Sequence, residues 1–454
     1  MKFDLRLVIG AMAILLASAQ LASAAVTAEE AAKLKTTLTP FGAEKAGNKE
    51  GTIPAWDGGY TQVPAGYKSG QPRPDPFANE KPILTITAQN MDQYADKLAE
   101  GVKALLKKYP SYRVDVYPTH RTAAAPQWVY DNTFKNATRA KLVPNGMGVE
   151  GAYGGIPFPI PKDGYEAISN HLLAWKGESI NEPFISAVVT ADGKRVMSAV
   201  DKQTEYPYYY KDGSPESFKG INYLLRLVTT APPFSAGEAL ILRETTNFAA
   251  NPRQTWQYLT GQRRVRKAPS FEYDAPNFGA SGVTNVDESL VFTGAMDRYE
   301  MKLVGKKEMF IPYNNNRFYL AKDPTVVLGP QHLNPDYVRW ELHRVWVVDA
   351  TLAPGKRHTV PHRRFYLDED TWGAILADAW DAQGQLWKLS FATPLLAYEL
   401  PAVAPQKGFG LYNLQTGVYQ ASDLMNGLSV HYESVPRQSA SFFTPENLAG
   451  TGVR

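Results

Sequence analysis

The sequence predicts an α+β protein that is mainly antiparallel β, built around a large curved sheet. Its 454 residues are rich in aromatic side chains, with 25 tyrosines, 19 phenylalanines and 9 tryptophans, which favour pleated surfaces. The 35 glycines and 33 prolines divide the chain into short elements joined by turns. From about Phe184 onward the apolar period changes from helical to alternating, which is typical of half-buried strands.

Three helices are expected before that change. Thr27 and Glu30 form a capping-box pattern that opens a short helix over 27–38. A Gly/Pro-rich stretch then runs to about residue 82, and its length indicates an extended strap along the body. Helical spacing predicts a second helix over 90–108, capped by Asn90, and a third over 165–175, capped by Asp163.

Strands are expected throughout the rest of the chain. Asp192-Gly193 separates two alternating runs, which predicts a β-hairpin. The close spacing of the runs that follow indicates an antiparallel meander without crossover helices, and so long a sheet must curl, split or close. The further strands are expected at 223–230, 239–246, 255–260, 299–311, 338–349, 357–367, 372–381, 386–391 and 429–433.

The last third contains one strand with two unlike faces. Trp372 and Trp380 fall on one face of its alternating pattern, and the small residues Gly373, Ala377 and Ala379 fall on the other. A helix packed in the concavity of the sheet and a thin spot in the core both fit this pattern equally well.

Residues 1–24 have the layout of a secretory signal peptide. Lys2 and Arg6 precede an apolar stretch over 7–16, and Ala22-Ser23-Ala24 is a small-residue cleavage site. The apolar stretch is shorter than the roughly 20 residues of a spanning helix, so we expect an exported chain that begins near Ala25. With no cysteine, neither a lipid-modified cysteine nor a disulfide is expected. A net charge of +3 is too weak to indicate nucleic-acid binding.

We expect five segments along the chain. The change of period near residue 181 is the best candidate for a boundary. The segments are 1–24, the signal peptide; 25–82, the N-terminal helix and strap; 83–180, helices and loops; 181–435, the antiparallel sheet body; and 436–454, a C-terminal tail.

Four long motifs resemble a known family. They are LTPFGAEKAGNKEGTIPAWDGG (38–59), GAYGGIPFPIPKDGYEAISNHLLAWKG (151–177), WQYLTGQRRVRKAPSFEYD (256–274) and FYLDEDTWGAILADAWDAQGQLWK (365–388). They are similar to the exported proteobacterial family of unknown function numbered 1329, which resembles outer-membrane lipoprotein-sorting carriers. The resemblance implies an open, incomplete β-barrel with helices packed at its concave face or mouth. It also implies a periplasmic carrier, associated with the outer membrane or with a resistance-nodulation-division type exporter and an outer-membrane partner.

The aromatic strand residues are the candidates for a ligand-binding interior. If these residues line a hydrophobic cavity, it would bind a hydrophobic or amphiphilic molecule through burial of apolar surface. The alternative is that they simply form an aromatic core. The candidate lining residues are Trp256, Tyr258, Trp340, Trp346, Trp372 and Trp380.

A basic run follows the first two of these residues. Arg264 and Arg266 share one face of a strand. They fit either a solvated sheet edge or a mouth that contacts an anionic headgroup, a partner or a membrane surface.

The sequence contains no catalytic motif, and we expect neither a cofactor nor a metal site. His358 and His362 are too far apart on an extended strand to share one metal, although His343 could pair with either. Asp368, Asp370 and Gly373 match a calcium loop only in part. Two alternatives to a carrier stay open: a carbohydrate-active or other hydrolytic enzyme with an aromatic cleft, and a cell-envelope assembly adaptor without a ligand.

Overall fold

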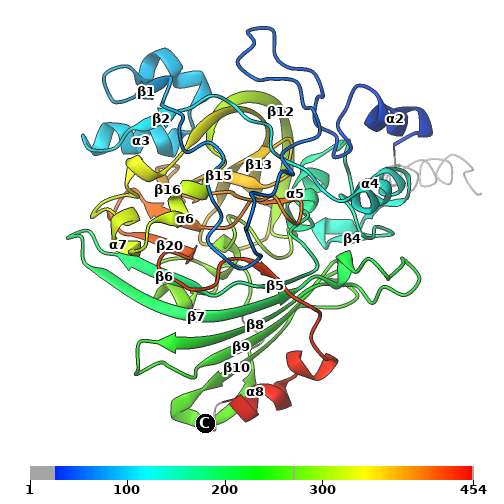
Figure 1. Cartoon of the computed structure of the whole chain (residues 1–454). Helices are drawn as coiled ribbons and strands as arrows, with labels where there is room; N and C mark the ends of the chain where they lie inside the picture. The colour runs from blue at the N-terminus through cyan, green and yellow to red at the C-terminus, as the bar shows by residue number, and fades with distance from the viewer. Residues whose placement is uncertain (1–25, 269–270, 452–454) are drawn as a thin grey trace, which may run out of the picture.

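The computed structural model describes residues 26–268 and 271–451 (Figure 1). The expected signal peptide lies outside these residues. No helix in the described part of the chain is long and apolar enough to cross a membrane.

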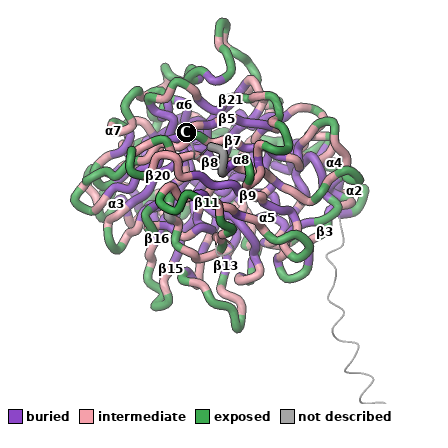
Figure 2. Tube along the Cα trace, turned by 90° about the horizontal axis from the view of Figure 1, so that it is seen from below, coloured by how far each residue is buried: buried purple, intermediate pink, exposed green. Residues whose placement is uncertain are grey.

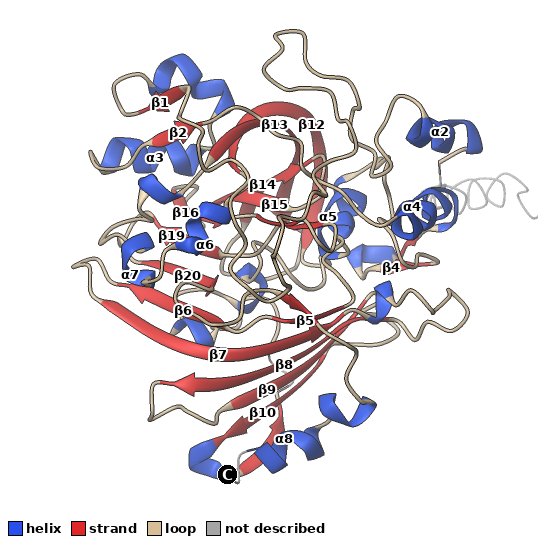
Figure 3. Cartoon of the chain, in the orientation of Figure 1, coloured by secondary structure: helices blue, strands red, loops and turns tan. Residues whose placement is uncertain are grey.

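One sheet of 17 strands dominates the molecule (Figure 3). Its neighbours pair almost entirely antiparallel, and no pairing among the described residues joins the outermost strands, β11 and β12. The predicted mainly antiparallel, curved and open sheet is therefore confirmed. In order, its main strands are β11 (Arg264–Lys267), β10 (Gln254–Leu259), β9 (Ala239–Thr245), β8 (Ile221–Ala231), β7 (Arg195–Glu205), β6 (Phe184–Val189), β20 (Tyr419–Leu424), β19 (Phe409–Asn413), β16 (Leu386–Ala392), β15 (Ala374–Trp380), β14 (His362–Asp368), β13 (Trp340–Leu352) and β12 (Tyr299–Pro312).

Short strands extend this sheet or form separate ribbons. β2 joins it through a parallel bridge to β13, and β5 pairs with β7. Strands from the segment 83–180 thus share the sheet of the segment 181–435, and the division into segments stays a prediction. The short strands are β1 (Leu84–Ile86), β2 (Val114–Val116), β3 (Lys141–Leu142), β4 (Val149–Glu150), β5 (Ser179–Asn181), β17 (Leu395–Ala397), β18 (Ala402–Ala404) and β21 (Glu433–Ser434).

The predicted hairpin is present between β6 and β7. Gly193 has a φ of +83° in the turn, a conformation that residues other than glycine rarely adopt. Val188 pairs with Val196 across the two strands. The long strand β7 curves beneath the body of the protein, with β8, β9 and β10 following it (Figure 1).

One expected helix is divided in the structure. The second expected helix is two helices, a 3-10 helix over Met91–Lys97 and α3, because Leu98 and Ala99 are extended. Two main-chain amides at the start of α3, those of Glu100 and Gly101, donate to Asp378, which fixes the break. The α-helices are α2 (Ala28–Ala32), α3 (Glu100–Lys108), α4 (Gln127–Arg139), α5 (Gly164–Leu172), α6 (Asn316–Leu320), α7 (Pro324–Val327) and α8 (Pro445–Thr451).

Two helix starts agree with the sequence, and α4, α6, α7 and α8 were not expected. Thr27 caps α2 with a full capping box, and the Asp163 side chain accepts from the Glu166 amide at the start of α5. Helix α4 escaped prediction because its buried face includes the polar residues Thr133 and Asn136, which hide the apolar period.

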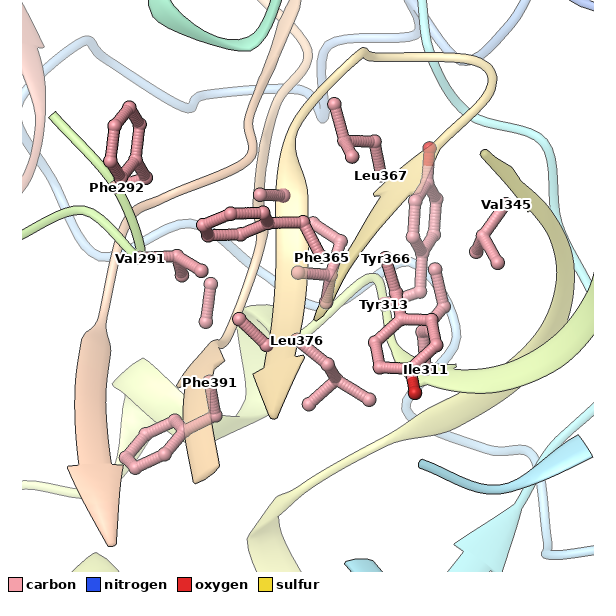
Figure 4. Close-up of a cluster of buried hydrophobic side chains, with 14 of the residues drawn as sticks. Val291, Phe292, Ile311, Tyr313, Val345, Phe365, Tyr366, Leu367, Leu376 and Phe391 are labelled. Atoms are coloured by element: carbon pink, nitrogen blue, oxygen red, sulfur yellow. The ribbon is translucent and has the colours of Figure 1, made fainter. Parts of the chain in front are cut away.

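The core lies mainly inside the curl of β12 to β16. Phe292 and Phe365 pack edge to face with ring centroids 5.4 Å apart, and Leu376 and Phe391 belong to the same buried cluster (Figure 4). Buried residues run through the centre of the molecule, and exposed loops surround them (Figure 2).

A buried ion pair ties the N-terminal strap to this core. The Arg121 guanidinium donates to both carboxylate oxygens of Asp370, at 2.9 and 2.7 Å, and to the carbonyl oxygen of Glu44 at 2.8 Å. Both charged side chains are 2% exposed. The pair therefore links three distant parts of the chain away from water.

Replacing Arg121 by methionine is expected to lower the free energy of unfolding by about 3–5 kcal/mol, because Asp370 would stay buried without its partner. Urea unfolding measures the loss. Arg113→Met is the matched control, since Arg113 also makes two carboxylate pairs but is 35% exposed, and it should lose at most about 1 kcal/mol. Equal losses in the two variants would contradict this assignment.

Candidate functional site

A cavity of about 420 Å³ lies between the concave face of the sheet and the chain that covers it. Strands β6, β7, β8 and β9 form one wall. Residues 271–293 supply the opposite wall, while β20, which pairs with β6, and the segment before β19 complete the lining. Its volume falls within the range of about 300–1,000 Å³ that is typical of small-molecule sites.

Alternation along the strands decides which side chains reach this cavity. On β8, Tyr223, Leu225, Leu227 and Thr229 line it, whereas Val228 packs on the other face against a cluster that includes Leu448 of α8. Leu225 and Leu227 are only half-buried. They retain apolar surface that the protein itself does not cover.

The outer end of the cavity is apolar and exposed. Val196 and Met197 at the start of β7 are 59% and 37% exposed, and Phe234 in the β8–β9 loop is 85% exposed. All three line the cavity, and the pairing of Ala199 with Ala231 places the two segments at the same end of the sheet. We call these three residues the rim.

The inner end of the cavity contains a cluster of charges. Lys202 Nζ lies 2.9 Å from Asp423 and 3.1 Å from Glu182, and Lys407 Nζ lies 3.3 Å from Glu182. Although burial opposes ionisation, Lys202 and Lys407 hold the pKa of Asp423 below its usual range. The same carboxylates raise the pKa of Lys202 against the effect of burial. Asp423 and Lys202 therefore stay charged, and each of the four groups has an ion-pair partner.

A third lysine, Lys176, lines the same end of the cavity. Its Nζ lies 5.9 Å from the centre of the Tyr206 ring, and the hydroxyl of Tyr432 donates to its carbonyl oxygen at 2.5 Å. Burial and repulsion from Lys202 lower the pKa of Lys176 to about 8. In the part of the chain that the structure describes, its ammonium group makes no hydrogen bond and no ion pair.

The first two predicted lining residues lie on the other side of the sheet. Trp256 and Tyr258 belong to the cluster beneath α8, while Gln257 between them lines the cavity. Arg266 pairs with Gln257 across β10 and β11, so Arg264 and Arg266 share the cavity face of the sheet at its exposed edge.

The other four predicted lining residues lie on β13, on β15 or directly before β15, and none of them lines this cavity. Trp346 stacks on the fully buried Trp372 with ring centroids 6.0 Å apart, and Trp380 stacks on His362. Trp340 is buried against a much smaller pocket. The sequence signal that marks the cavity is instead the aliphatic alternation of β6 to β9.

The three histidines considered for a metal do not converge. His358 pairs with Asp287 at 2.9 Å and His362 with Asp349 at 3.0 Å. His343, Asp368 and Asp370 do offer ligand atoms within 4.8 Å of one another. Arg121 donates to both carboxylate oxygens of Asp370, so this member of the group is already paired with a guanidinium.

Replacing Lys176 by methionine is expected to stabilise the unliganded protein at pH 7 by on the order of 2 kcal/mol, because it removes a half-buried, unpaired charge. Below pH 8 the folded and unfolded states both carry the proton, so the full cost is present. Between pH 8 and the ordinary pKa of 10.5, only the unfolded state keeps it, so wild-type stability should approach that of the variant.

Thermal unfolding at pH 7 and pH 10 measures this difference. Lys302→Met is the control, since Lys302 is exposed on β12. A loss of stability in Lys176→Met at pH 7 would show instead that the ammonium group supports the fold.

This chain matches a known protein family and a known protein. Residues 85–449 match the family model described as protein of unknown function (DUF1329). "Uncharacterized protein PA3922" of Pseudomonas aeruginosa is 41% identical over 452 residues, which cover 98% of each chain.

Two solved structures are more distantly similar to this chain. A DUF1329 family protein from Desulfovibrio piger is 14% identical with a TM-score of 0.39, covering 60% of this chain and 92% of that one. A LolA superfamily protein from Nitrosomonas europaea is 10% identical with a TM-score of 0.35, covering 63% of this chain and 100% of that one. The family match spans most of the chain, and this protein therefore belongs to the family described as protein of unknown function (DUF1329).

Proposed function

We propose that this protein is a periplasmic carrier that binds a hydrophobic or amphiphilic molecule in the cavity beside β6 to β9. The observation that carries the proposal is the half-buried aliphatic wall, which includes Leu225 and Leu227, in a cavity of about 420 Å³ with an apolar rim. A ligand that covers this wall gains about 25 cal/mol for each Å² of apolar surface removed from water. Affinity should therefore increase with the length of the apolar chain.

The charges at the inner end of the cavity favour binding over glycoside hydrolysis. A glycosidase site needs carboxylates that are free to exchange protons or attack a substrate. Glu182 and Asp423, the buried carboxylates at the inner end, are both held by Lys202 and Lys407.

Export to the periplasm is supported by the signal-peptide layout of residues 1–24. The family resemblance adds, as part of the proposal, an inner-membrane exporter of the resistance-nodulation-division type and an outer-membrane partner. Arg264 and Arg266 lie on the cavity face of the exposed edge strand β11, where they could contact an anionic headgroup, a partner or a membrane surface. The exposed Phe234 on the rim offers the apolar part of such a contact.

The neutral fluorophore N-phenyl-1-naphthylamine tests the cavity directly. We expect its fluorescence to rise on binding, and Leu227→Asp to weaken binding about tenfold or more, because a carboxylate would face the apolar probe. Val304→Asp is the control, since Val304 is 53% exposed on β12 and does not line the cavity. Equal binding by all three proteins, or none by the folded wild type, would contradict the proposal.

A further inference from the structure

The charges at the inner end of the cavity do not cancel. Lys202 and Lys407 share Glu182 and Asp423 between them, and Arg253 is paired with Glu244. Lys176 lies beside these pairs, and no carboxylate of residues 26–268 or 271–451 lies within ion-pair distance of it. The cluster therefore carries one positive charge in excess, located on Lys176.

An unpaired ammonium group beside an apolar cavity is costly to maintain. Its desolvation disfavours the charged form, and neighbouring Lys202 repels it. The ring of Tyr206, 5.9 Å from Nζ, offsets only a small part of that cost. An anionic group placed at this end of the cavity would remove the imbalance and form a charge-assisted hydrogen bond.

The shape of the cavity fixes the direction of such a ligand. Val196 of the rim and Lys202 at the charged end lie about 20 Å apart along β7, which is comparable to a long acyl chain. The aliphatic side chains of β8, among them Leu225 and Leu227, lie along the way. The polar end of the ligand would thus lie innermost, and the tail would run out to the rim.

We propose that the cavity binds a single-chain amphiphile with one anionic end, a carboxylate or a phosphate monoester, which pairs with Lys176 while its tail extends toward Phe234. This inference rests on the proposed carrier function and names its ligand class. Lys176 supplies specificity for the anionic end, and the aliphatic wall supplies most of the affinity.

Dodecanoate and dodecanol, which share a tail and differ in charge, test this assignment at pH 7. Displacement of N-phenyl-1-naphthylamine reports the affinity of each. The wild type should bind dodecanoate about tenfold or more tightly than dodecanol. Lys176→Met should bind the two ligands equally, with its affinity for dodecanol unchanged. Lys302→Met should keep the wild-type preference.

The same displacement measurement with dodecyl phosphate distinguishes the two anionic groups. Whichever of dodecyl phosphate and dodecanoate binds more tightly identifies the anionic group of the ligand. Equal binding of dodecanol and both anions by the wild type would overturn the inference and leave the carrier function in place. A preference that persists in Lys176→Met would overturn it as well. Failure of the folded wild type to bind the fluorophore would instead remove the proposed function on which the inference depends.

Discussion

Alternation of side chains along β6 to β9 is the constraint on which the binding site depends. Each strand directs one set of residues toward α8 or solvent and the other toward the covering segment 271–293. On the cavity side of the open sheet, Leu225 and Leu227 of β8 stay half-buried. A closed, fully packed sheet with the same alternation would have no room for a ligand.

Two buried ionic clusters show how burial can serve different ends in one molecule. Around Arg121 the guanidinium is matched by Asp370 and by main-chain carbonyl oxygens, and the result is a link between the strap and the core. Around Lys202 the pairs are also complete, yet Lys176 beside them is not matched. The first arrangement stabilises the fold, while the second leaves an unpaired positive charge that an anionic ligand can neutralise.

Local signals in the sequence predicted most of the architecture. The Asp192-Gly193 turn, the Asp163 cap and the alternating runs reflect short-range chemistry, so the hairpin, α5 and most strands follow from them. Strands β19 and β20 were not expected, nor was α4, whose buried Asn136 donates to the distant main-chain carbonyl oxygens of Gly155 and Ile156.

The site was harder to predict than the fold. Alternation indicates that Trp256 and Gln257 face opposite ways, but which of them faces a cavity depends on α8, about two hundred residues later in the chain. Lys176 lies outside the sheet altogether, and its lack of a partner is visible only once Glu182 and Asp423 are seen with Lys202 and Lys407. Native mass spectrometry with lipid extraction, on protein purified from its own cells, tests the central claim most directly. A bound amphiphile at one copy per chain is the predicted result, whereas an unliganded mass that does not change when amphiphiles are added would contradict it.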